Sequence, residues 1–376
     1  EVGVARNLLP ALSRRTPGRR IGLSVTTAAG RQLAESAVGK AVPVFAFPFD
    51  LAGPVEKALA AVNPGIVLLT ETEIWPLFLE RAAARGIPAV LVNGRVSDRS
   101  FRRYSAVRSF LEMSLRRVAL FAMQSAEDAA RIEALGAPSD RVQVTGNVKY
   151  DLAEAPPFPD AARLREAASG RPVLVAASTA EGEEEAVLAA WRSLEAGVRP
   201  LLALAPRRPE RFEAVAGLLE NSGLAVLRRS SAPAAVARPG RNGDSRGVVY
   251  LLDSIGELVS LYREARLAFI GGSLAPQGGH NPIEAWSAGV PVLVGPHTEN
   301  FRQITEEGEA NGFARRVSDE RDLARELARA FSPSTGVSDA GERARLYVAQ
   351  NRGAADRTVD LLMPFLEAPA RRRAAP

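Results

Sequence analysis

A strand, a glycine-rich loop and the start of a helix follow one another in the stretch Leu267-Ala268-Phe269-Ile270-Gly271-Gly272-Ser273-Leu274-Ala275-Pro276-Gln277-Gly278-Gly279-His280-Asn281-Pro282-Ile283-Glu284-Ala285. Its two glycine pairs let the backbone approach a ligand closely. Asn281 is a favourable N-cap, Pro282 fits the first helical turn, and Glu284 stands at the capping-box position. Free N–H groups at such a helix start favour a phosphate, although an ordinary turn and helix cap produce the same pattern.

The same order of a short apolar run and a helix-length segment recurs along the whole chain. Helical patterns include Glu183–Ala196, Pro209–Ser222 and Ser254–Glu264. In the first half, the candidate strands are Ile21–Val25, Val42–Phe47, Ile66–Thr70, Ala89–Asn93, Leu120–Met123 and Val142–Thr145. In the second half, they are Val173–Ala177, Leu201–Ala205, Leu224–Leu227, Val248–Leu252, Leu267–Ile270 and Val292–Val294. This alternation is typical of parallel sheets with right-handed crossovers, which bind ligands beyond the carboxyl ends of their strands.

A proline-rich stretch, Ala155–Pro159, separates the two series of strands. We therefore predict an α/β chain of two Rossmann-like domains, residues 1–154 and 172–345, joined by a linker over residues 155–171. Residues 346–376 are predicted to form a C-terminal helix and a frayed tail at Ala368–Pro376. The Ser230–Arg246 segment is rich in Ser, Ala, Pro, Gly and Arg and is predicted to be a flexible loop.

The chain begins at Glu1 rather than at Met, on an amphipathic pattern. Val4, Leu8, Leu9 and Leu12 fall on roughly one face of a predicted helix. We therefore expect a longer natural protein, with room for an N-terminal anchor. The sequence contains no signal peptide and no run of ~18 apolar residues.

The amino-acid composition limits the kinds of functional site that this chain can form. Of 376 residues, none is Cys and 2 are His. That excludes a disulfide scaffold, a Cys-ligated zinc site, a thiol nucleophile and a multi-His metal centre. The net charge of +5 rests mainly on arginine, because the lysines are only Lys40, Lys57 and Lys149. A basic chain suits anionic partners such as nucleotide phosphates, a phospholipid surface or a nucleic acid.

Other strand ends in the second half carry candidate ligand contacts. Pro206-Arg207 ends one strand, and Arg207 suits a bidentate contact with phosphate, or belongs to a solvated basic helix start. Ile255-Gly256-Glu257 follows another strand, where backbone N–H groups could hold a base or a ribose. Ser178-Thr179 could hold a carboxylate or phosphate oxygen, and the glutamates at 183–185 complement a helix dipole.

In the first half, charged residues again follow strands. Glu71 and Glu73 come after an apolar strand, where carboxylates serve either a polar substrate or local caps. Arg95 and Arg99 follow the next strand and suit an anionic acceptor, or are surface charges. Lys149, one of the few lysines, closes this half just before the linker.

Several nucleotide-binding signatures are missing from the sequence. It has no Asp-x-Asp pair, no G-x-x-x-x-G-K-[ST] loop, and no G-x-G-x-x-G after the first strands. P-loop chemistry and a dehydrogenase are therefore disfavoured. Because histidine is so scarce, we expect a general base to be Glu or Asp.

Several segments together resemble the 3-deoxy-D-manno-octulosonic acid (Kdo) transferases of lipopolysaccharide synthesis. They are Glu71–Pro76, Gly146–Asp151, Ser178–Glu184, Pro206–Phe212, Gly271–Ala285 and Gly295–Phe301. The resemblance implies a glycosyltransferase B fold, with two facing Rossmann-like domains and a cleft between them. It also implies an inverting transfer of Kdo from CMP-Kdo to the lipid A precursor (lipid IVA), without a metal or other cofactor.

The resemblance also implies roles for individual residues. Glu1 matches the general base, and Glu71 and Lys149 match the residues that stabilise the transition state. The matching CMP-binding positions are Pro206, Arg207, Ile255, Gly256, Glu257, Asn281, Pro282, Ile283 and Glu284. Apart from the roles that the resemblance implies, their places at strand ends and in the glycine-rich loop make further candidate contacts of Ser178, Thr179, Gly272, Ser273, His280 and Arg95.

By the same resemblance, residues 1–154 are expected to bind the acceptor and residues 172–345 the CMP-sugar. The expected location is the cytoplasmic side of the inner membrane, reached peripherally or through an anchor. Arg14–Arg20 and Ser100–Arg117, the latter with Phe101, Tyr104 and Phe110, suit anionic lipid, or are solvated helix faces. No nucleic-acid partner is expected, because the sequence has no RNP, KH or zinc motif.

Two other functions stay open at this point. A nucleotide-sugar epimerase of the same fold would need no lipid acceptor. A non-catalytic protein that binds nucleotide-sugar or lipid would release no CMP from CMP-Kdo.

Overall fold

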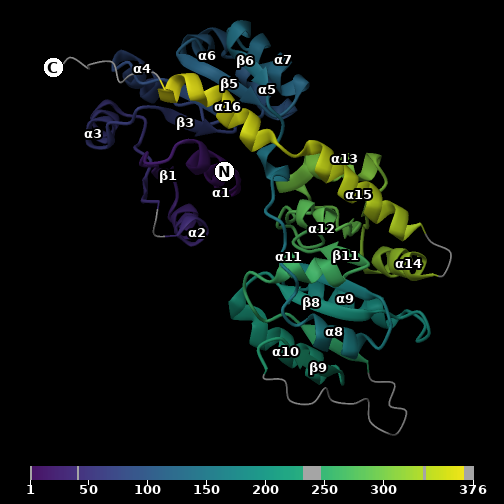
Figure 1. Cartoon of the computed structure of the whole chain (residues 1–376). Coiled ribbons are helices and arrows are strands. Elements are labelled where there is room, and N and C mark those ends of the chain that lie inside the picture. The colour runs from purple at the N-terminus through teal and green to yellow at the C-terminus, as the bar shows by residue number, and fades with distance from the viewer. Residues whose placement is uncertain (1, 40–41, 232–246, 333–335, 368–376) are drawn as a thin grey trace. The chain divides into compact units, whose positions relative to one another are not determined.

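The computed structural model describes residues 2–39, 42–231, 247–332 and 336–367. Glu1, most of the predicted Ser230–Arg246 loop and the Ala368–Pro376 tail therefore lie outside the described residues. The chain divides into two compact units (Figure 1). Unit 1 combines Glu1–Ala153 with Asn351–Pro376, and unit 2 is Glu154–Gln350. Compared with the predicted division, the C-terminal segment returns to the first unit and the predicted linker belongs to the second.

Unit 2 is built on a seven-stranded sheet whose paired strands all run parallel. Its strands are β7 (Val173–Thr179), β8 (Leu201–Pro206), β9 (Ala225–Arg228), β10 (Val248–Leu251), β11 (Leu267–Ile270), β12 (Val292–Val294) and β13 (Ala314–Arg316). They are ordered β13-β12-β11-β7-β8-β10-β9. The order reverses at β7, so the loops after β7 and β11 flank the topological switch point, where parallel sheets bind ligands.

Helices α9, α10 and α14 cover one face of this sheet through a single apolar cluster. Trp191 of α9 is fully buried there, and its indole N–H donates to the carbonyl of Pro200 at 2.9 Å. The helices of unit 2 are α8 (Ala161–Ala168), α9 (Glu183–Arg192), α10 (Phe212–Asn221), α11 (Leu258–Leu261), α12 (Ile283–Ser287), α13 (Arg302–Ala310), α14 (Glu320–Phe331) and α15 (Val337–Asn351). The predicted helix Ser254–Glu264 is only one α turn, α11, followed by a 3-10 turn, Tyr262–Glu264.

Unit 1 contains two separate parallel sheets. The larger sheet has four strands, which lie side by side in the order in which they occur in the chain. They are β3 (Val67–Thr70), β4 (Ala89–Gly94), β5 (Val118–Met123) and β6 (Val142–Val144). The other two, β1 (Leu23–Val25) and β2 (Val44–Ala46), pair only with each other. Every predicted strand of this half exists, but the first two are short and only half-buried, and they stay apart from the main sheet.

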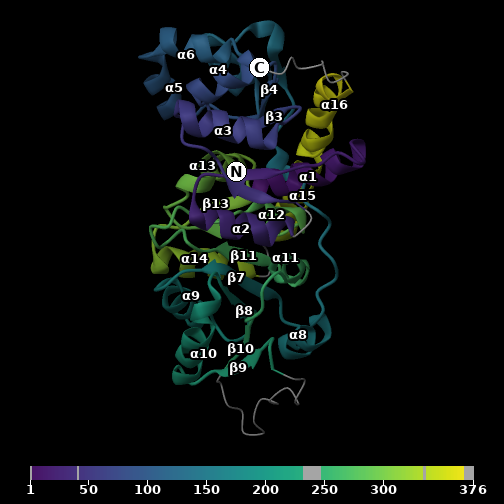
Figure 2. The same cartoon turned by 90° about the vertical axis from the view of Figure 1, so that its left-hand side faces the viewer.

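The first and last helices of unit 1 pack on each other and on β4 and β5. Figure 2 shows α16 (Ala354–Glu367) beside α1, although the two helices lie near opposite ends of the chain. In α1 (Val2–Arg15), Val4, Leu8 and Leu12 are buried, as the amphipathic pattern predicts. The remaining helices are α2 (Ala28–Val38), α3 (Ala52–Val62), α4 (Pro76–Ala84), α5 (Asp98–Ser105), α6 (Arg108–Leu115) and α7 (Ala126–Ala134).

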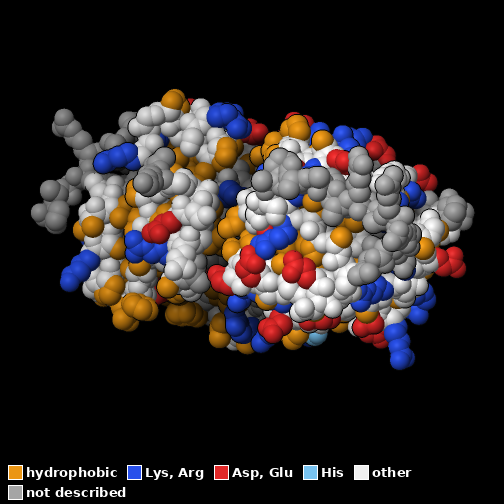
Figure 3. Space-filling model, turned by 90° about the horizontal axis from the view of Figure 1, so that it is seen from below, with side chains coloured by type: hydrophobic (Ala, Val, Ile, Leu, Met, Phe, Trp, Pro, Cys, Tyr) orange, Lys and Arg blue, Asp and Glu red, His pale blue; other side chains and the backbone are white. Residues whose placement is uncertain are grey.

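The prediction of an α/β fold with parallel sheets is confirmed. The strand β13 was missed, because two of its three residues are Arg and it carries no apolar run. On the face drawn in Figure 3, the Lys and Arg side chains are interspersed with Asp and Glu. Within the described ranges, none of the helices is both long and apolar enough to cross a membrane.

Candidate functional site

The glycine-rich loop after β11 is anchored by the buried carboxylate of Glu183, at the start of α9. This side chain is 1% exposed. Five backbone N–H groups donate to it at 2.7–3.0 Å, those of Ala180, Gly272, Ser273, Leu274 and Ala275. An array of N–H groups of this kind would bind an anion, and here the anion is a side chain of the same unit.

This anchoring changes the expected part played by Gly272 and Ser273. Their N–H groups already donate to Glu183. Ser273 is fully buried, and its hydroxyl accepts from the N–H of Gly295 at 2.8 Å. In this arrangement the first half of the loop supports the site, and its N–H groups are not available to a ligand.

The loop also needs glycine where it passes β7. Gly271 donates its N–H to the carbonyl of Ala177 at 2.8 Å. A Cβ at Gly271 would lie 2.6 Å from the carbonyl oxygen of Ser178, well inside van der Waals contact. Ser178 itself has φ +52°, a left-handed conformation that costs energy in a residue other than glycine. The two strand ends at the switch point are therefore in direct backbone contact.

The acidic residues at the start of α9 do more than complement a helix dipole. Besides Glu183, Glu184 is fully buried. It accepts from the hydroxyl of Thr179 at 2.8 Å and forms a bidentate pair with Arg211 at 2.6 and 3.1 Å. The Thr179 hydroxyl is therefore already engaged within the unit. Only Glu185 is exposed, as the helix-dipole interpretation expects.

His280, in the second half of the loop, packs against Gly272, where a Cβ would lie 2.9 Å from its Nε2 atom. Burial and the positive charge of Arg207 lower the pKa of this imidazole. At neutral pH the ring is therefore uncharged. Its Nε2 is buried and has no hydrogen-bond partner among the described residues.

The helix after this loop, α12, begins one residue later than predicted, with Pro282 in the N-cap position. Asn281 still performs the predicted capping, because its Oδ1 accepts from the N–H of Ile283 at 3.1 Å.

Two other strand ends at the same edge of this sheet carry predicted contact residues. The backbone N–H of Arg207, after β8, donates to the carbonyl of Thr179 at 3.0 Å. Its side chain is exposed, and its guanidinium has no partner in the described part of the chain. After β10, Ile255 is 78% exposed, whereas the carboxylate of Glu257 is paired with Arg229 at 2.8 Å through both oxygens.

In unit 1, Glu71 and Lys149 form an ion pair of 2.8 Å between Oε1 and Nζ. Both side chains are about one-fifth exposed. Glu71 ends β3 with φ +57°, and Lys149 lies in a 3-10 turn, Val148–Tyr150, after β6. The structure therefore brings together two charged residues that are 78 positions apart in the sequence.

Two opposing effects set the pKa of the Glu71 carboxyl. Burial raises it, but the charge and contact of Lys149 outweigh burial and hold the pKa below its ordinary 4.5. Other positive charges contribute less, and Arg95 contributes least among them. Because the folded-state pKa is lowered, ionised Glu71 stabilises the folded protein above pH 4.5. That contribution is lost as the pH falls through the folded-state value.

Asn93 positions the turn that carries Lys149, and the sequence analysis did not single it out. It is fully buried at the end of β4, with φ +53°. Its Oδ1 accepts from the N–H of Val148 at 2.9 Å, and Asn7 donates to the carbonyl of Val148 at 3.0 Å. The available signal was a polar residue at the end of a strand that is buried throughout.

The other carboxylates near β3 have local partners. Glu73 accepts from the indole N–H of Trp75 at 2.7 Å. Asp50, not Glu73, caps α4, accepting from the N–H groups of Leu77 and Phe78 at 3.1 and 2.7 Å.

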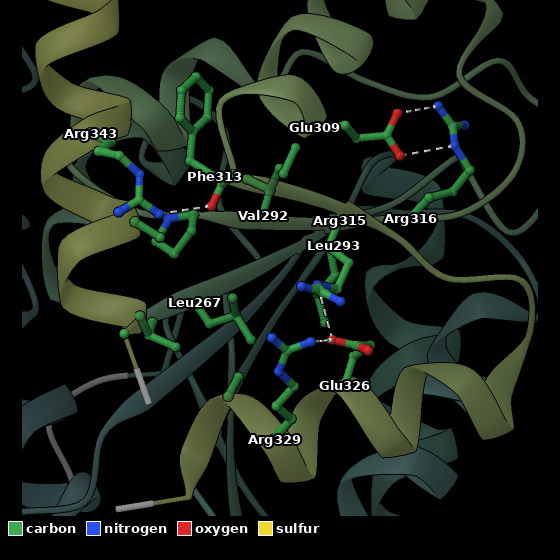
Figure 4. Close-up of a pocket in the computed structure, with 17 residues that line it drawn as sticks. Leu267, Val292, Leu293, Glu309, Phe313, Arg315, Arg316, Glu326, Arg329 and Arg343 are labelled. Carbon is green, nitrogen blue, oxygen red and sulfur yellow. Dashed lines mark hydrogen bonds and ion pairs between the residues drawn. The ribbon is translucent and has the colours of Figure 1, made fainter. Parts of the chain in front are cut away.

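A pocket of about 680 Å³ in unit 2 lies away from these residues (Figure 4). It is lined mainly by the amino-terminal ends of β11, β12 and β13, and by α14 and α15. Most of its charged residues pair with each other, Arg316 with Glu309, and Arg315 and Arg329 with Glu326. Arg343 donates instead to the backbone carbonyls of Asn311 and Gly312. Because ligands of parallel sheets bind at the carboxyl ends, we do not assign the substrate site here.

The chain is similar in sequence to known proteins. Residues 1–152 match the family described as 3-deoxy-D-manno-octulosonic-acid transferase (kdotransferase). A 3-deoxy-D-manno-octulosonic acid transferase of Haemophilus influenzae is 34% identical over 98% of this chain and 85% of its own length. The Bordetella pertussis transferase of the same name is 37% identical over 97% of this chain and 85% of its own.

Among solved structures, UDP-GlcNAc 2-epimerase from Neisseria meningitidis shares the fold. It has a TM-score of 0.60 and 14% identity, with 97% of each chain covered. The fold and the curated relatives define the chain as a glycosyltransferase of the glycosyltransferase B class. It belongs to the 3-deoxy-D-manno-octulosonic acid (Kdo) transferase family of lipopolysaccharide biosynthesis.

Replacing Lys149 by Gln removes the cation that holds down the pKa of Glu71. Burial then dominates, and we expect the pKa of the Glu71 carboxyl to rise from below to above 4.5. Carbon-13 NMR titration of the side-chain carboxyls measures this rise. Lys57→Gln, which changes an exposed lysine of α3, is the matched control and leaves the pKa of Glu71 unchanged. An unchanged value in Lys149→Gln would contradict the described pair.

Replacing Glu183 by Ala leaves five buried N–H groups without their acceptor. We expect the amides of Gly272 to Ala275 to exchange with solvent at least ~10-fold faster, because each lost acceptor favours opening of the loop. Hydrogen exchange followed by mass spectrometry measures this. Glu185→Ala removes an exposed carboxylate from the same helical turn and should leave the exchange unchanged. Equal protection in both variants would refute the anchoring role of Glu183.

Proposed function

We propose that this protein transfers Kdo from CMP-Kdo to the lipid A precursor, with inversion at the anomeric carbon and without a metal. The observation that carries the proposal is the half-buried Glu71–Lys149 pair, held at 2.8 Å in a chain of this family. A carboxylate and an ammonium group fixed in this way can stabilise charge that develops as the bond to CMP breaks.

In the proposal, unit 2 holds the donor. Arg207 supports this role, because its exposed guanidinium lies at a strand end and can bind a phosphate through two parallel hydrogen bonds. Asn281, Pro282, Ile283 and Glu284 would complete the CMP site, with Pro206, Ile255, Gly256 and Glu257 from the neighbouring strand ends. Because Glu257 is paired with Arg229, its contribution would come from the backbone. His280, with its unpartnered Nε2, and Ser178 would lie beside the CMP.

The acceptor step requires a base. Glu1, which lies outside the described residues, would take the proton of the acceptor's primary hydroxyl as that oxygen bonds to the anomeric carbon. The bond between the anomeric carbon and the CMP phosphate breaks, and CMP leaves with the electron pair. A positioned base contributes roughly 10²–10⁴-fold. Attack opposite the leaving group inverts the anomeric centre.

CMP release from CMP-Kdo, with and without the lipid A precursor, tests this function. Release that depends on the precursor and continues in EDTA supports it. An epimerase would act without the lipid, and a binding protein would release no CMP.

Arg207→Ala should weaken CMP binding about 10- to 100-fold, because it removes a charged bidentate contact with the phosphate. Isothermal titration calorimetry with CMP measures the change. The neighbouring exposed Arg208→Ala removes the same charge one residue further on and should stay within about twofold of the parent. Unchanged affinity in Arg207→Ala would remove Arg207 from the donor site.

We also propose that the α5–α6 surface, made of Arg102, Arg103, Arg108, Val107, Phe110 and Met113, contacts the anionic membrane that contains the acceptor. Val107, Phe110 and Met113 are 51–60% exposed, and the three arginines beside them are exposed as well. Exposed apolar groups next to arginines are typical of membrane surfaces.

Some of the other predicted lipid contacts are engaged within unit 1. Phe101 and Tyr104 pack against the core. Arg14 and Arg15 pair with Asp356 and Asp360 of α16.

Replacing Phe110 and Met113 together by Ser should reduce co-sedimentation with phosphatidylglycerol vesicles at least ~5-fold, because both groups lose their apolar contact with the bilayer. The matched control is Val144→Ser, a 51% exposed residue of β6 in the same unit. Equal sedimentation of the double variant and the control would overturn the membrane role of α5–α6.

A further inference from the structure

We infer that Arg95 binds an anionic group of a substrate, a carboxylate or a phosphate, beside the Glu71–Lys149 pair. The inference rests on the proposed function and names a contact that neither the fold nor the family membership assigns. It is carried by a turn after β4 that is held by hydrogen bonds and that presents Arg95, a half-buried residue whose guanidinium has no partner among the described residues.

The turn that presents Arg95 is held on both sides. The buried carboxylate of Asp128 accepts from the N–H of Val96 at 2.7 Å, and Arg131 donates to the carbonyl of Val96 at 2.7 Å. On the other side, the amide of Gln124 donates to the carbonyl of Asn93 at 2.9 Å.

Packing also fixes the residue before Arg95. A Cβ at Gly94 would lie 2.5 Å from the sulfur of Met123, so the backbone fits closely over β5. A side chain on such a braced turn loses little entropy when it binds, which is the advantage of preorganisation.

Arg95 itself is left unpaired. Its side chain is half-buried, and no hydrogen bond or ion pair reaches its guanidinium from the part of the chain that the structure describes. The neighbouring Arg131 contrasts with it, because that guanidinium bonds to Val96, Asp98 and Glu127. A guanidinium without a protein partner can form charge-assisted, bidentate hydrogen bonds with an anionic ligand.

The position of Arg95 points to the substrate rather than to a distant surface ligand. Glu71 donates its N–H to the carbonyl of Val92 at 3.0 Å, close to the end of β4 from which Arg95 extends. The charge of Arg95 also makes a small contribution to lowering the pKa of the Glu71 carboxyl. Glu71 pairs with Lys149, so the three side chains together carry one net positive charge. A single anionic group is the ligand that balances them. The sugar acid of the donor and the phosphates of the acceptor both supply such a group.

Steady-state kinetics of Arg95→Gln and Arg95→Lys test the inference, with CMP-Kdo and the lipid A precursor varied in turn. We expect Arg95→Gln to raise KM at least ~10-fold for one of the two substrates, and Arg95→Lys to recover part of the loss. A higher KM for CMP-Kdo identifies the donor as the substrate whose anionic group Arg95 binds. A higher KM for the precursor identifies its phosphate.

Thermal unfolding without substrate separates binding from a structural role. Removing an unpaired cation should leave the melting temperature of Arg95→Gln equal to or above that of the parent. The matched control is Arg85→Gln, which changes an arginine paired with Glu56 at the C-terminus of α4, and which keeps both KM values within twofold. KM values within twofold for both substrates in Arg95→Gln, or a lower melting temperature, would overturn the inference.

The assay of the parent protein separates this inference from the proposed function. If the parent transfers no Kdo, the proposed function fails. Equilibrium binding of CMP-Kdo and of the precursor to the parent and to Arg95→Gln then decides the role of Arg95. Affinity that falls ~10-fold for either ligand supports it, and equal affinities for both refute it.

Discussion

The buried carboxylate of Glu183 is the interaction on which unit 2 depends. It gathers N–H groups from the loops after β7 and β11, at the point where the strand order of the sheet reverses. Without an acceptor, these donors would be buried and unsatisfied. With it, the loop is rigid, and His280 rests on Gly272 beside the exposed strand ends. A glycine-rich loop is flexible because of its composition. Here the hydrogen bonds to the Glu183 carboxylate hold it in one conformation.

In unit 1, strained backbone conformations hold the residues at the strand ends in place. Glu71 and Asn93 end two adjacent parallel strands, and both adopt the left-handed conformation that glycine normally supplies. Glu71 thereby turns to meet Lys149, while Asn93 holds the backbone of Val148. Strained residues of this kind persist where the surrounding structure holds them, and they cluster at functional sites.

The arginines that are candidates for substrate binding differ from the others in that no carboxylate of the described residues pairs with them. Arginine is common in this chain, so a single Arg in a motif carries little information. Arg211, Arg229 and Arg131 are all consumed by carboxylates of their own unit. Arg207 and Arg95 have no such partners among the described residues, and each follows a strand at its carboxyl end. A guanidinium without a protein partner therefore lies at each of these two strand ends, where an anion can bind it.

The sequence by itself determined the parallel α/β architecture, because alternating apolar runs and helical periodicity report burial, which is a local property. It also indicated the strand ends that carry candidate contacts and, through the resemblance, pointed to Glu71 and Lys149 without predicting that they form an ion pair. Only the tertiary structure decided which residues hold the loops and turns at these strand ends in place. Glu183 and the loop at Gly272, like Asn93 and Val148, are far apart in sequence. Their hydrogen bonds depend on distances that no local pattern encodes, because they exist only once the sheet has brought its strand ends together.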